Sequence, residues 1–374
     1  MSIDRRRFLM GLAAGSVGLA WSPAHAAATG GPLLVIVLRG GLDGLAAVPA
    51  PGDPSFATAR GAAGDVPMGP LLDDTFALHP SLASWQALWD DRDLLVAHGV
   101  GLPYARRSHF DAQDMLGSGL PQPMASETGW LGRAVHEAGG QGVAVGRAVP
   151  LLLRGPGGVR SVDPTRRSRR DEGRLEAVRA SLAADPVLGT ALEDALDMRA
   201  TLDRLGGGRA RDLADTLATT AKLMALPDGP RVASLELDGW DTHSRQGPVL
   251  EKLLAELAEG VVAFRDADPT LWKRAMVLVV TEFGRTVAGN GTDGTDHGVG
   301  GVAFALGGAV DGGRVLADWR GLGPDALVDG RDLPATTDLR ALFAGALVSQ
   351  LGLSEGRALD AFPGSGDLRP VGLT

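Results

Sequence analysis

Two apolar runs decide the fold of this chain: Val232-Ala-Ser-Leu-Glu-Leu237 and Ala275-Met-Val-Leu-Val-Val280. Their length and composition predict two β-strands. Polar residues fit to bind a cation follow each run, in Asp238-Gly-Trp-Asp-Thr-His243 and Thr281-Glu-Phe-Gly-Arg285. A third polar group, Gly294-Thr-Asp-His-Gly298, comes shortly after them. Ligands of an open α/β sheet gather outside the carboxyl ends of its strands, so we expect these groups to form one site.

Other segments extend this α/β pattern in both directions. Pro32-Leu-Leu-Val-Ile-Val-Leu38 is a continuous apolar run, which is typical of a central parallel strand covered on both faces. Further strands or amphipathic helices are predicted at 81–91, 93–98, 248–264, 300–306 and 337–351. Residues 49–70 are dense in glycine, proline and alanine and predict a surface loop. We therefore expect an α/β fold with a mostly parallel central sheet sandwiched between helices.

Residues 161–226 differ in composition from the rest of the chain. Arginine pairs lead into stretches of alanine, leucine, aspartate, glutamate and arginine at helical spacing, and Gly206-Gly-Gly208 interrupts them. This pattern predicts a helical insertion or cap on a single α/β domain that spans residues 27–374.

The first 26 residues have the features of an export signal. Asp4-Arg-Arg-Arg-Phe-Leu-Met10 contains a twin arginine, an apolar run extends to Trp21, and Ala24-His-Ala26 fits a signal peptidase. The apolar run is shorter than the ~20 residues of a permanent membrane span. We expect a cleaved twin-arginine signal peptide over residues 1–26, the twin-arginine export machinery as a partner, and a periplasmic or secreted protein; an uncleaved N-terminal anchor is the alternative.

Charge and cysteine content exclude several classes of function. The formal net charge is -9, which argues against nucleic acid as a partner because phosphate binding needs a basic surface. An anionic small-molecule or polymer ester substrate stays compatible, since a bound cation supplies positive charge locally. The chain has no cysteine, which excludes disulfides, thiolate zinc sites and a cysteine nucleophile.

The strongest candidate metal ligands are Asp241 and His243. Residues two apart in an extended segment project to the same side, so this carboxylate and imidazole can converge on one cation. Alternatively, Asp238 or Asp241 caps the following helix and His243 makes a local hydrogen bond. Asp296 and His297 lie in a loop with few apolar residues, where a buried structural histidine is less expected. The two groups together favour a metal site.

Three further side chains are candidates for the same site. Glu282 is the next candidate metal ligand, or else the partner of Arg285 three residues on. Arg285 alternatively binds an anionic substrate oxygen, because a guanidinium presents paired donors. Asp43, between glycines after the first strand, is either a metal ligand or a turn residue.

Ser108 is the candidate nucleophile. Ser108-His-Phe-Asp111 matches a helix start, where amide donors and the helix dipole favour negative charge. The alternative is a plain helix N-cap. His109 either joins the site as a catalytic group or is a polar residue of that helix. A Walker-type loop, a Gly-x-Ser-x-Gly elbow and a His-Glu-x-x-His helix are all missing from the sequence.

These motifs taken together resemble one bacterial family. Five of them occur in one order after the twin arginine: Leu38-Arg-Gly-Gly-Leu-Asp-Gly44, Arg107-Ser-His-Phe-Asp-Ala-Gln-Asp114, Gly239-Trp-Asp-Thr-His243, Thr281-Glu-Phe-Gly-Arg285 and Thr295-Asp-His-Gly298. The combination resembles the domain-of-unknown-function family 1501 across nearly the whole mature chain. That family is similar to the alkaline phosphatase and sulfatase superfamily, which implies a parallel sheet between helices and a site at the strand ends.

The resemblance also implies roles for individual residues. Carried over motif by motif, it implies metal ligands at Asp43, Asp241, His243 and His297, and a nucleophile at Ser108. Glu282 stands where the superfamily usually has the aspartate of an Asp-His pair, but Phe283 stands where the histidine is expected. A second metal is therefore absent or differently held. The Ser-x-Pro-x-Arg signature is also missing, so a formylglycine sulfatase is not expected.

We therefore expect an exported metal-dependent hydrolase of a phosphate or sulfate ester. One or two divalent ions would polarise the ester and help to ionise Ser108 or a water. Asp43 and Glu282 would hold a second ion or orient the nucleophile. Arg285 would stabilise the anionic group. Zinc suits histidine with carboxylate ligands, and calcium, manganese or magnesium suits carboxylates. The alternative is a non-catalytic, metal-stabilised periplasmic binding or assembly protein, with residues 161–226 as its partner surface.

Overall fold

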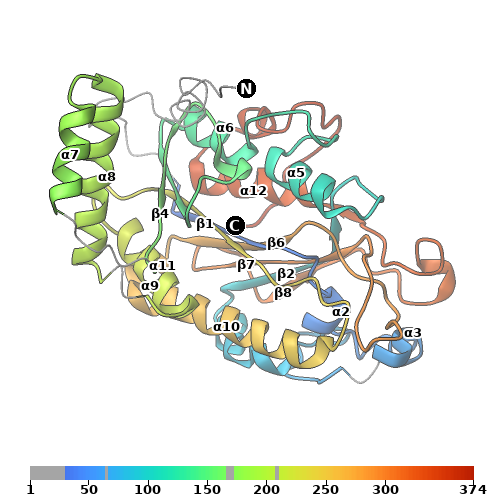
Figure 1. Ribbon diagram of the computed structural model, residues 1–374. Helices are drawn as coiled ribbons and strands as arrows, with labels where there is room; N and C mark the ends of the chain where they lie inside the picture. The colour runs from blue at the N-terminus through green and yellow to red at the C-terminus, as the bar shows by residue number, and fades with distance from the viewer. Residues whose placement is uncertain (1–29, 64–65, 166–171, 207–209) are drawn as a thin grey trace.

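A computed structural model describes residues 30–63, 66–165, 172–206 and 210–374 (Figure 1). The predicted signal peptide, residues 1–26, lies outside this part of the chain. Within the described residues, no helix has both the length and the hydropathy that crossing a membrane requires.

One mixed sheet forms the centre of the molecule. Its nine strands, counted over the described residues, run in the order β4-β3-β5-β1-β6-β7-β2-β8, with β9 paired to β2. The central strands are β5 (Val232–Leu237), β1 (Leu33–Leu38), β6 (Met276–Thr281) and β7 (Gly301–Leu306). The outer strands are β2 (Leu94–Gly101), β3 (Gln141–Val145), β4 (Gly158–Val162), β8 (Arg314–Leu316) and β9 (Thr337–Asp338). Only β7 runs antiparallel to its neighbours, so the predicted mostly parallel sheet is confirmed.

Helices cover both faces of this sheet, because the strands carry apolar side chains toward each of the two faces. Along β1, Leu33, Val35 and Val37 pack on one face, and the residues between them pack on the other. The first face carries α5 (His109–Ser118), α6 (Trp130–Glu137), α12 (Leu339–Leu351) and α13 (Glu355–Leu359). The second carries α2 (Gly44–Ala47), α4 (Gln86–Asp90), α9 (Leu213–Met224), α10 (Gln246–Ala267) and α11 (Pro269–Trp272) (Figure 1). The predicted helix–sheet–helix layering is therefore confirmed.

The predicted insertion at 161–226 starts with the last two residues of β4 and is otherwise mainly helical in its described part, where its helices form two separate pieces. Helices α7 (Glu172–Leu182) and α8 (Pro186–Arg204) form an antiparallel pair at the β4 end of the sheet, and Leu202 is the buried residue of α8 (Figure 1). Helix α9 packs against α10 and belongs to the helical layer. A cap function for this segment stays a prediction.

Two predicted segments differ in detail. The predicted loop 49–70 contains the short helix α3 (Phe56–Arg60), and Arg60 at its end is buried. The predicted helix 81–91 is a 3₁₀ turn, Pro80–Trp85, followed by α4. Proline sets the φ angle for the first turn of such a segment, but it does not determine whether the turn is α or 3₁₀.

A buried histidine in β2 is expected to make the stability of this fold depend on pH. Nδ1 of His98 accepts the Gly99 N–H (3.0 Å), so Nε2 carries the hydrogen and donates to the Val48 carbonyl (3.1 Å). Burial lowers the pKa of His98 from 6.5 to about 4. Below pH 6.5 the unfolded chain therefore binds a proton that the folded chain excludes. We expect this group to reduce the free energy of unfolding by up to about 3 kcal/mol between pH 6.5 and pH 4.

Urea unfolding of metal-depleted protein at pH 6.5 and pH 4.5 measures this effect. His98→Asn is expected to lower stability at pH 6.5 and to flatten the pH dependence, whereas His136→Asn, at an exposed position on α6, is expected to leave the dependence unchanged. Equal pH slopes in the wild type and His98→Asn would contradict the assignment.

Candidate metal centre

Three loops meet at one edge of the sheet because the strands before them end in register. Leu38 of β1 lies opposite Leu237 of β5 and Thr281 of β6. The polar residues that follow these strands therefore leave from the same edge. The loop before β7 joins them, since Gly298 N–H donates to the Gly284 carbonyl (2.8 Å). The expected meeting of the polar groups at the strand ends is observed.

Two glycines allow the loop that carries Asp241 and His243 to pack tightly against its neighbours. A Cβ on Gly40, whose φ is +128°, would lie 2.2 Å from the backbone nitrogen of Asp241. A Cβ on Gly294 would lie 2.3 Å from the carbonyl carbon of His243. Any larger residue would displace this loop, so glycine is required at both positions.

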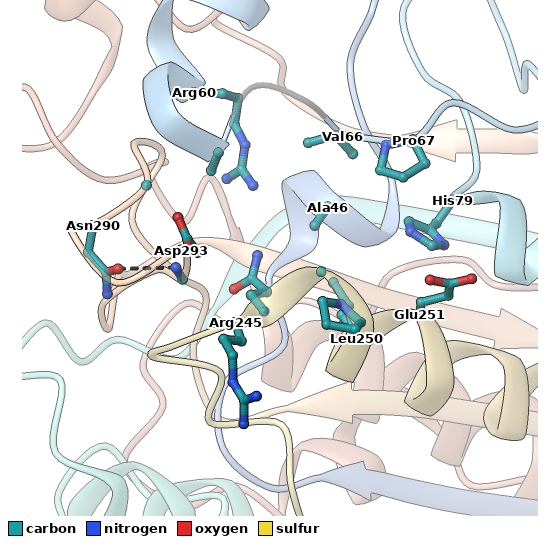
Figure 2. Close-up of a pocket in the computed structure, with 16 residues that line it drawn as sticks. Ala46, Arg60, Val66, Pro67, His79, Arg245, Leu250, Glu251, Asn290 and Asp293 are labelled. Carbon is teal, nitrogen blue, oxygen red and sulfur yellow. Dashed lines mark hydrogen bonds between the residues drawn. The ribbon is translucent and has the colours of Figure 1, made fainter.

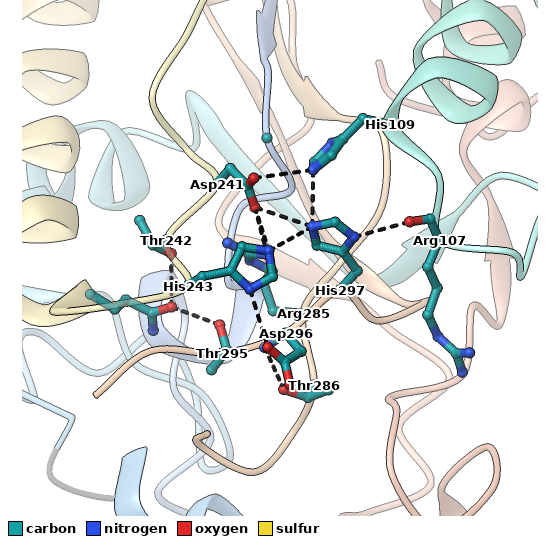
Figure 3. A network of polar contacts seen from close by, with 12 residues as sticks. Arg107, His109, Asp241, Thr242, His243, Arg285, Thr286, Thr295, Asp296 and His297 are labelled. Carbon is teal, nitrogen blue, oxygen red and sulfur yellow. Dashed lines mark hydrogen bonds and ion pairs between the residues drawn. The ribbon is translucent and has the colours of Figure 1, made fainter. Parts of the chain in front are cut away.

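Four side chains converge at this edge: His109, Asp241, His243 and His297 (Figure 3). Nε2 of His297 lies 3.0 Å from Nε2 of His109 and 2.9 Å from Nε2 of His243. The Asp241 carboxylate lies 3.1 to 3.4 Å from the three Nε2 atoms. Ligand atoms of His109, Asp241 and His297 form a compact set, all within 4.8 Å of one another. We call these four residues the histidine–aspartate cluster.

Each imidazole of the cluster is held from its far side by an oxygen atom. The Nδ1 partners are Glu282 Oε1 for His109 (2.8 Å), Asp296 Oδ1 for His243 (3.1 Å) and the Arg107 carbonyl for His297 (3.0 Å). A carboxylate or a carbonyl only accepts hydrogen bonds, so each Nδ1 carries the hydrogen. Each Nε2 therefore presents a lone pair to the centre of the cluster.

This arrangement fits one small cation. The Nε2 atoms of His109 and His243 each lie 2.9 to 3.4 Å from His297 Nε2 and from the Asp241 carboxylate, and positive charge at the centre would stabilise this arrangement. Ligand atoms at 2.0–2.1 Å from a tetrahedral zinc ion are ~3.3 Å apart, which is close to the spacing of His297 Nε2 from its two histidine neighbours and of the Asp241 carboxylate from the three imidazoles. The cluster is also accessible, because the side chains of Asp241 and His243 are each 43% exposed.

Glu282, predicted as a metal ligand, lies in a second layer behind His109. It is buried, and its Oε1 accepts from His109, from Gly40 N–H (2.9 Å) and from Gln113 Nε2 (2.9 Å). Burial acts to raise the pKa of the Glu282 carboxyl, but these hydrogen bonds outweigh it and hold the pKa below its usual value. The bond to Glu282 in turn raises the pKa of His109.

Asp296, also predicted as a ligand, has the same kind of position behind His243. Its Oδ1 accepts from Asn290 Nδ2 (3.1 Å) as well as facing His243. The hydrogen bond from Asn290 and the contact with His243 lower the pKa of the Asp296 carboxyl. The structure thus brings His109 into the cluster, where the sequence predicted a catalytic group, and places Asp296 and Glu282 behind the imidazoles.

Arg285 lies on the inner side of Asp241. Its side chain is fully buried, and Nη1 is 3.0 Å from Asp241 Oδ1. The geometry of this ion pair is not that of a hydrogen bond, and among the described residues the guanidinium nitrogens have no hydrogen-bond partner. Burial acts to raise the pKa of Asp241, but the positive charge of Arg285 and the contacts with His243, His109 and His297 outweigh it and lower this pKa. Arg285 therefore faces the carboxylate, and the predicted contact with substrate stays a prediction.

Asp43 has a different set of partners from the cluster. Its carboxylate accepts from Arg60 Nη2 (2.9 Å), Gln246 Nε2 (2.7 Å) and Ala46 N–H (3.1 Å), the last as the N-cap of α2. The described contacts engage both oxygens, so we do not place Asp43 in the proposed metal site. Arg60 and Gln246 were not found from the sequence, because a Gly/Pro/Ala-rich loop and a helix start give no signal for a buried pair.

Ser108 is the N-cap of α5, as its helix-start motif predicted. Its Oγ accepts from Asp111 N–H at 3.5 Å. The preceding residue, Arg107, has φ of +61°, and its Nε donates to the buried Asp332 (2.9 Å). This turn directs the Arg107 carbonyl to His297 and places Ser108 one residue before His109. The nucleophilic role of Ser108 stays a prediction.

Several solved structures are similar to this chain at low sequence identity. One of them is an inactive form of the murine ectonucleotide pyrophosphatase/phosphodiesterase 5 in complex with AMP, with 9% identity and a TM-score of 0.32. The match covers 68% of this chain and 57% of the murine protein, so this chain spans little more than half the length of the murine protein. The C-terminal periplasmic domain of EcEptC from Escherichia coli, in complex with Zn, has 10% identity and a TM-score of 0.37 over 75% and 74%. A protein in the alkaline phosphatase superfamily from Vibrio parahaemolyticus has 13% identity and a TM-score of 0.36 over 84% and 71%. At these TM-scores we assign no chemistry from them.

The family to which the chain belongs follows from its sequence. A search of curated proteins finds no match. One family model matches residues 72–362, a range that contains four of the five motifs and all four residues of the histidine–aspartate cluster. The chain therefore belongs to the family described as Protein of unknown function (DUF1501).

Proposed function

We propose that this protein is a metal-dependent hydrolase of a phosphate or sulfate ester, with the cation held by the histidine–aspartate cluster. One observation carries the proposal: three Nε2 lone pairs and one carboxylate converge, and each imidazole is fixed from behind by an oxygen. Oxygen partners on the outer nitrogen are the usual companions of metal-binding histidines. The exposure of Asp241 leaves one side of the site open to a substrate.

Zinc is the ion that this donor set suits best. Imidazole nitrogens with one carboxylate are typical zinc ligands, whereas calcium and magnesium prefer oxygen donors. With Asp43 bonded to Arg60, and with Glu282 and Asp296 behind histidines, we propose one ion. When bound, it would polarise the ester and lower the pKa of a hydroxyl or water.

The residues of the chain prepare the site for this chemistry. Glu282, Asp296 and the Arg107 carbonyl keep the Nδ1 hydrogens in place, so the Nε2 atoms stay free for the ion. Arg285 keeps Asp241 ionised from the inner side. Ser108, at the positive end of α5, is the proposed nucleophile, with a water as the alternative. Export through the twin-arginine route would place the activity in the periplasm or outside the cell.

Removal and return of the metal tests this function. We expect protein purified from the periplasm to contain about one zinc per chain and to cleave at least one of 4-nitrophenyl phosphate, bis(4-nitrophenyl) phosphate and 4-nitrophenyl sulfate. A chelator should abolish cleavage and zinc should restore it. Ser108→Ala should lower turnover and keep the zinc. Cleavage that survives complete metal removal contradicts the proposal, and bound zinc without cleavage of any ester favours the non-catalytic binding protein.

A further inference from the structure

A groove of about 570 Å³ opens beside the histidine–aspartate cluster. We propose that it binds the alcohol part of the ester substrate, and that this part has an aromatic or other apolar body. The inference rests on the proposed function, because it assumes that the ester group itself lies at the cluster. The volume is within the range of about 300–1,000 Å³ that is usual for small-molecule sites.

Two side chains, Gln113 and Glu282, lie between the groove and the cluster. Gln113, one helical turn after His109, lines the groove, and its Nε2 donates to Glu282 Oε1 (2.9 Å). The same Glu282 oxygen faces Nδ1 of His109. Arg39 also lines the groove and donates to Gln113 Oε1 (2.5 Å) and Glu236 Oε2 (2.8 Å). In the proposed pose, the substrate reaches the groove over the exposed ring of Phe110, which directly follows His109 and lines the groove.

Two apolar side chains at the groove are unusually exposed. Phe110 is 81% exposed and Met124 is 70% exposed, the highest values among the large hydrophobic residues of the described chain. Both line this groove. Phe110 directly follows His109, and Met124 is held in place because its N–H donates to Asp114 Oδ1 (2.7 Å). Single exposed apolar residues are common, but two on one groove next to a site indicate a binding surface.

The charges of the groove indicate the kind of group that it accepts. Arg39, Arg147 and Arg154 line it together with Asp114, Glu236 and Asp238, so neither sign prevails. Arg39 forms an ion pair with Glu236, and Asp114 accepts a hydrogen bond from the Met124 N–H. A polyanionic polymer needs a groove of net positive charge, which this one lacks. An uncharged body that stacks on Phe110 and packs on Met124 matches the lining.

Substitutions at the groove test the inference with 2-naphthyl phosphate and methyl phosphate as probes. Phe110→Ala and Met124→Ala are each expected to raise KM for 2-naphthyl phosphate by about tenfold with little change in kcat, and to leave methyl phosphate unaffected. Phe110→Tyr keeps the ring and should behave as wild type. Leu71→Ala, at a 66% exposed position away from the groove, is the matched control. Equal effects on both esters, or no effect on either, would overturn the inference.

Calorimetric binding of 2-naphthyl phosphate separates this inference from the proposed function. We expect the wild type to bind the probe and both alanine variants to bind it about tenfold more weakly. If this pattern appears but no ester is cleaved, the hydrolase proposal fails and the proposed binding role of the groove is supported. If esters are cleaved but the variants bind 2-naphthyl phosphate like the wild type, the groove proposal fails and the hydrolase proposal is supported.

Discussion

Replacing His297 by alanine is expected to lower zinc affinity by more than about 100-fold and to abolish ester hydrolysis. His297 Nε2 lies 3.0 Å from His109 Nε2, 2.9 Å from His243 Nε2 and 3.2 Å from Asp241 Oδ1. Removing this imidazole therefore takes away the ligand that contacts each of the other three. Loss of a residue that only orients a ligand costs about 10–100-fold in metal affinity, and loss of the ligand itself should exceed that range.

Elemental analysis after dialysis, and competition with a chromophoric chelator, measure this effect. Glu282→Gln removes the negative charge behind His109 and keeps the size of the side chain, so it should give the smaller, 10–100-fold loss. His136→Ala, on the exposed part of α6, is the control and should bind zinc as the wild type does. Full zinc content in folded His297→Ala would contradict the assignment of the cluster.

The sequence predicted which loops meet, but it did not predict which side chains face the centre of the site and which lie behind them. Three strands that end in register bring their following residues to one edge, and this could be predicted from the apolar runs and the polar residues after them. Asp241, His243 and His297 were predicted as ligands on that basis, and the structure brings them together. Their ligation of a metal stays a prediction until an ion is measured.

The layer to which a residue belongs depends on the orientation of each imidazole ring, which sequence spacing does not encode. Glu282 and Asp296 come from the predicted loops, but their carboxylates face the Nδ1 atoms of His109 and His243. His109 is supplied by the start of α5, far along the sequence from the other three residues. Its ring points to the cluster because the turn at Arg107 starts the helix in that direction.

A similar reason explains why the pairing of Asp43 was missed. Glycines around Asp43 and a strand before it are equally compatible with a metal ligand and with an N-cap. Its observed partner, Arg60, comes from a segment whose composition predicted only a surface loop. Composition gives the average exposure of a segment, and it does not show that one long side chain turns inward to a buried carboxylate.

Replacing Arg60 by alanine is expected to lower the free energy of unfolding by about 3–5 kcal/mol. Arg60 and Asp43 are 1% and 2% exposed, and Arg60 also donates to the Val287 carbonyl (3.0 Å). The substitution leaves the Asp43 charge buried, with Gln246 and the Ala46 N–H as its remaining donors among the described residues. Arg60 and Gln246 also line a pocket of about 500 Å³ (Figure 2).

Urea unfolding of three variants separates the buried charge from lost packing. Arg60→Met with Asp43→Asn removes both charges and keeps the cap of α2, so it should recover part of the loss. Arg320→Ala, which removes a similar pair with Asp318 at the surface, should change stability by less than about 1 kcal/mol. Zinc content gives a further readout. If Arg60→Ala gains a second zinc, Asp43 ligates metal once its arginine is removed; if zinc stays at one per chain, the Asp43–Arg60 pair is structural.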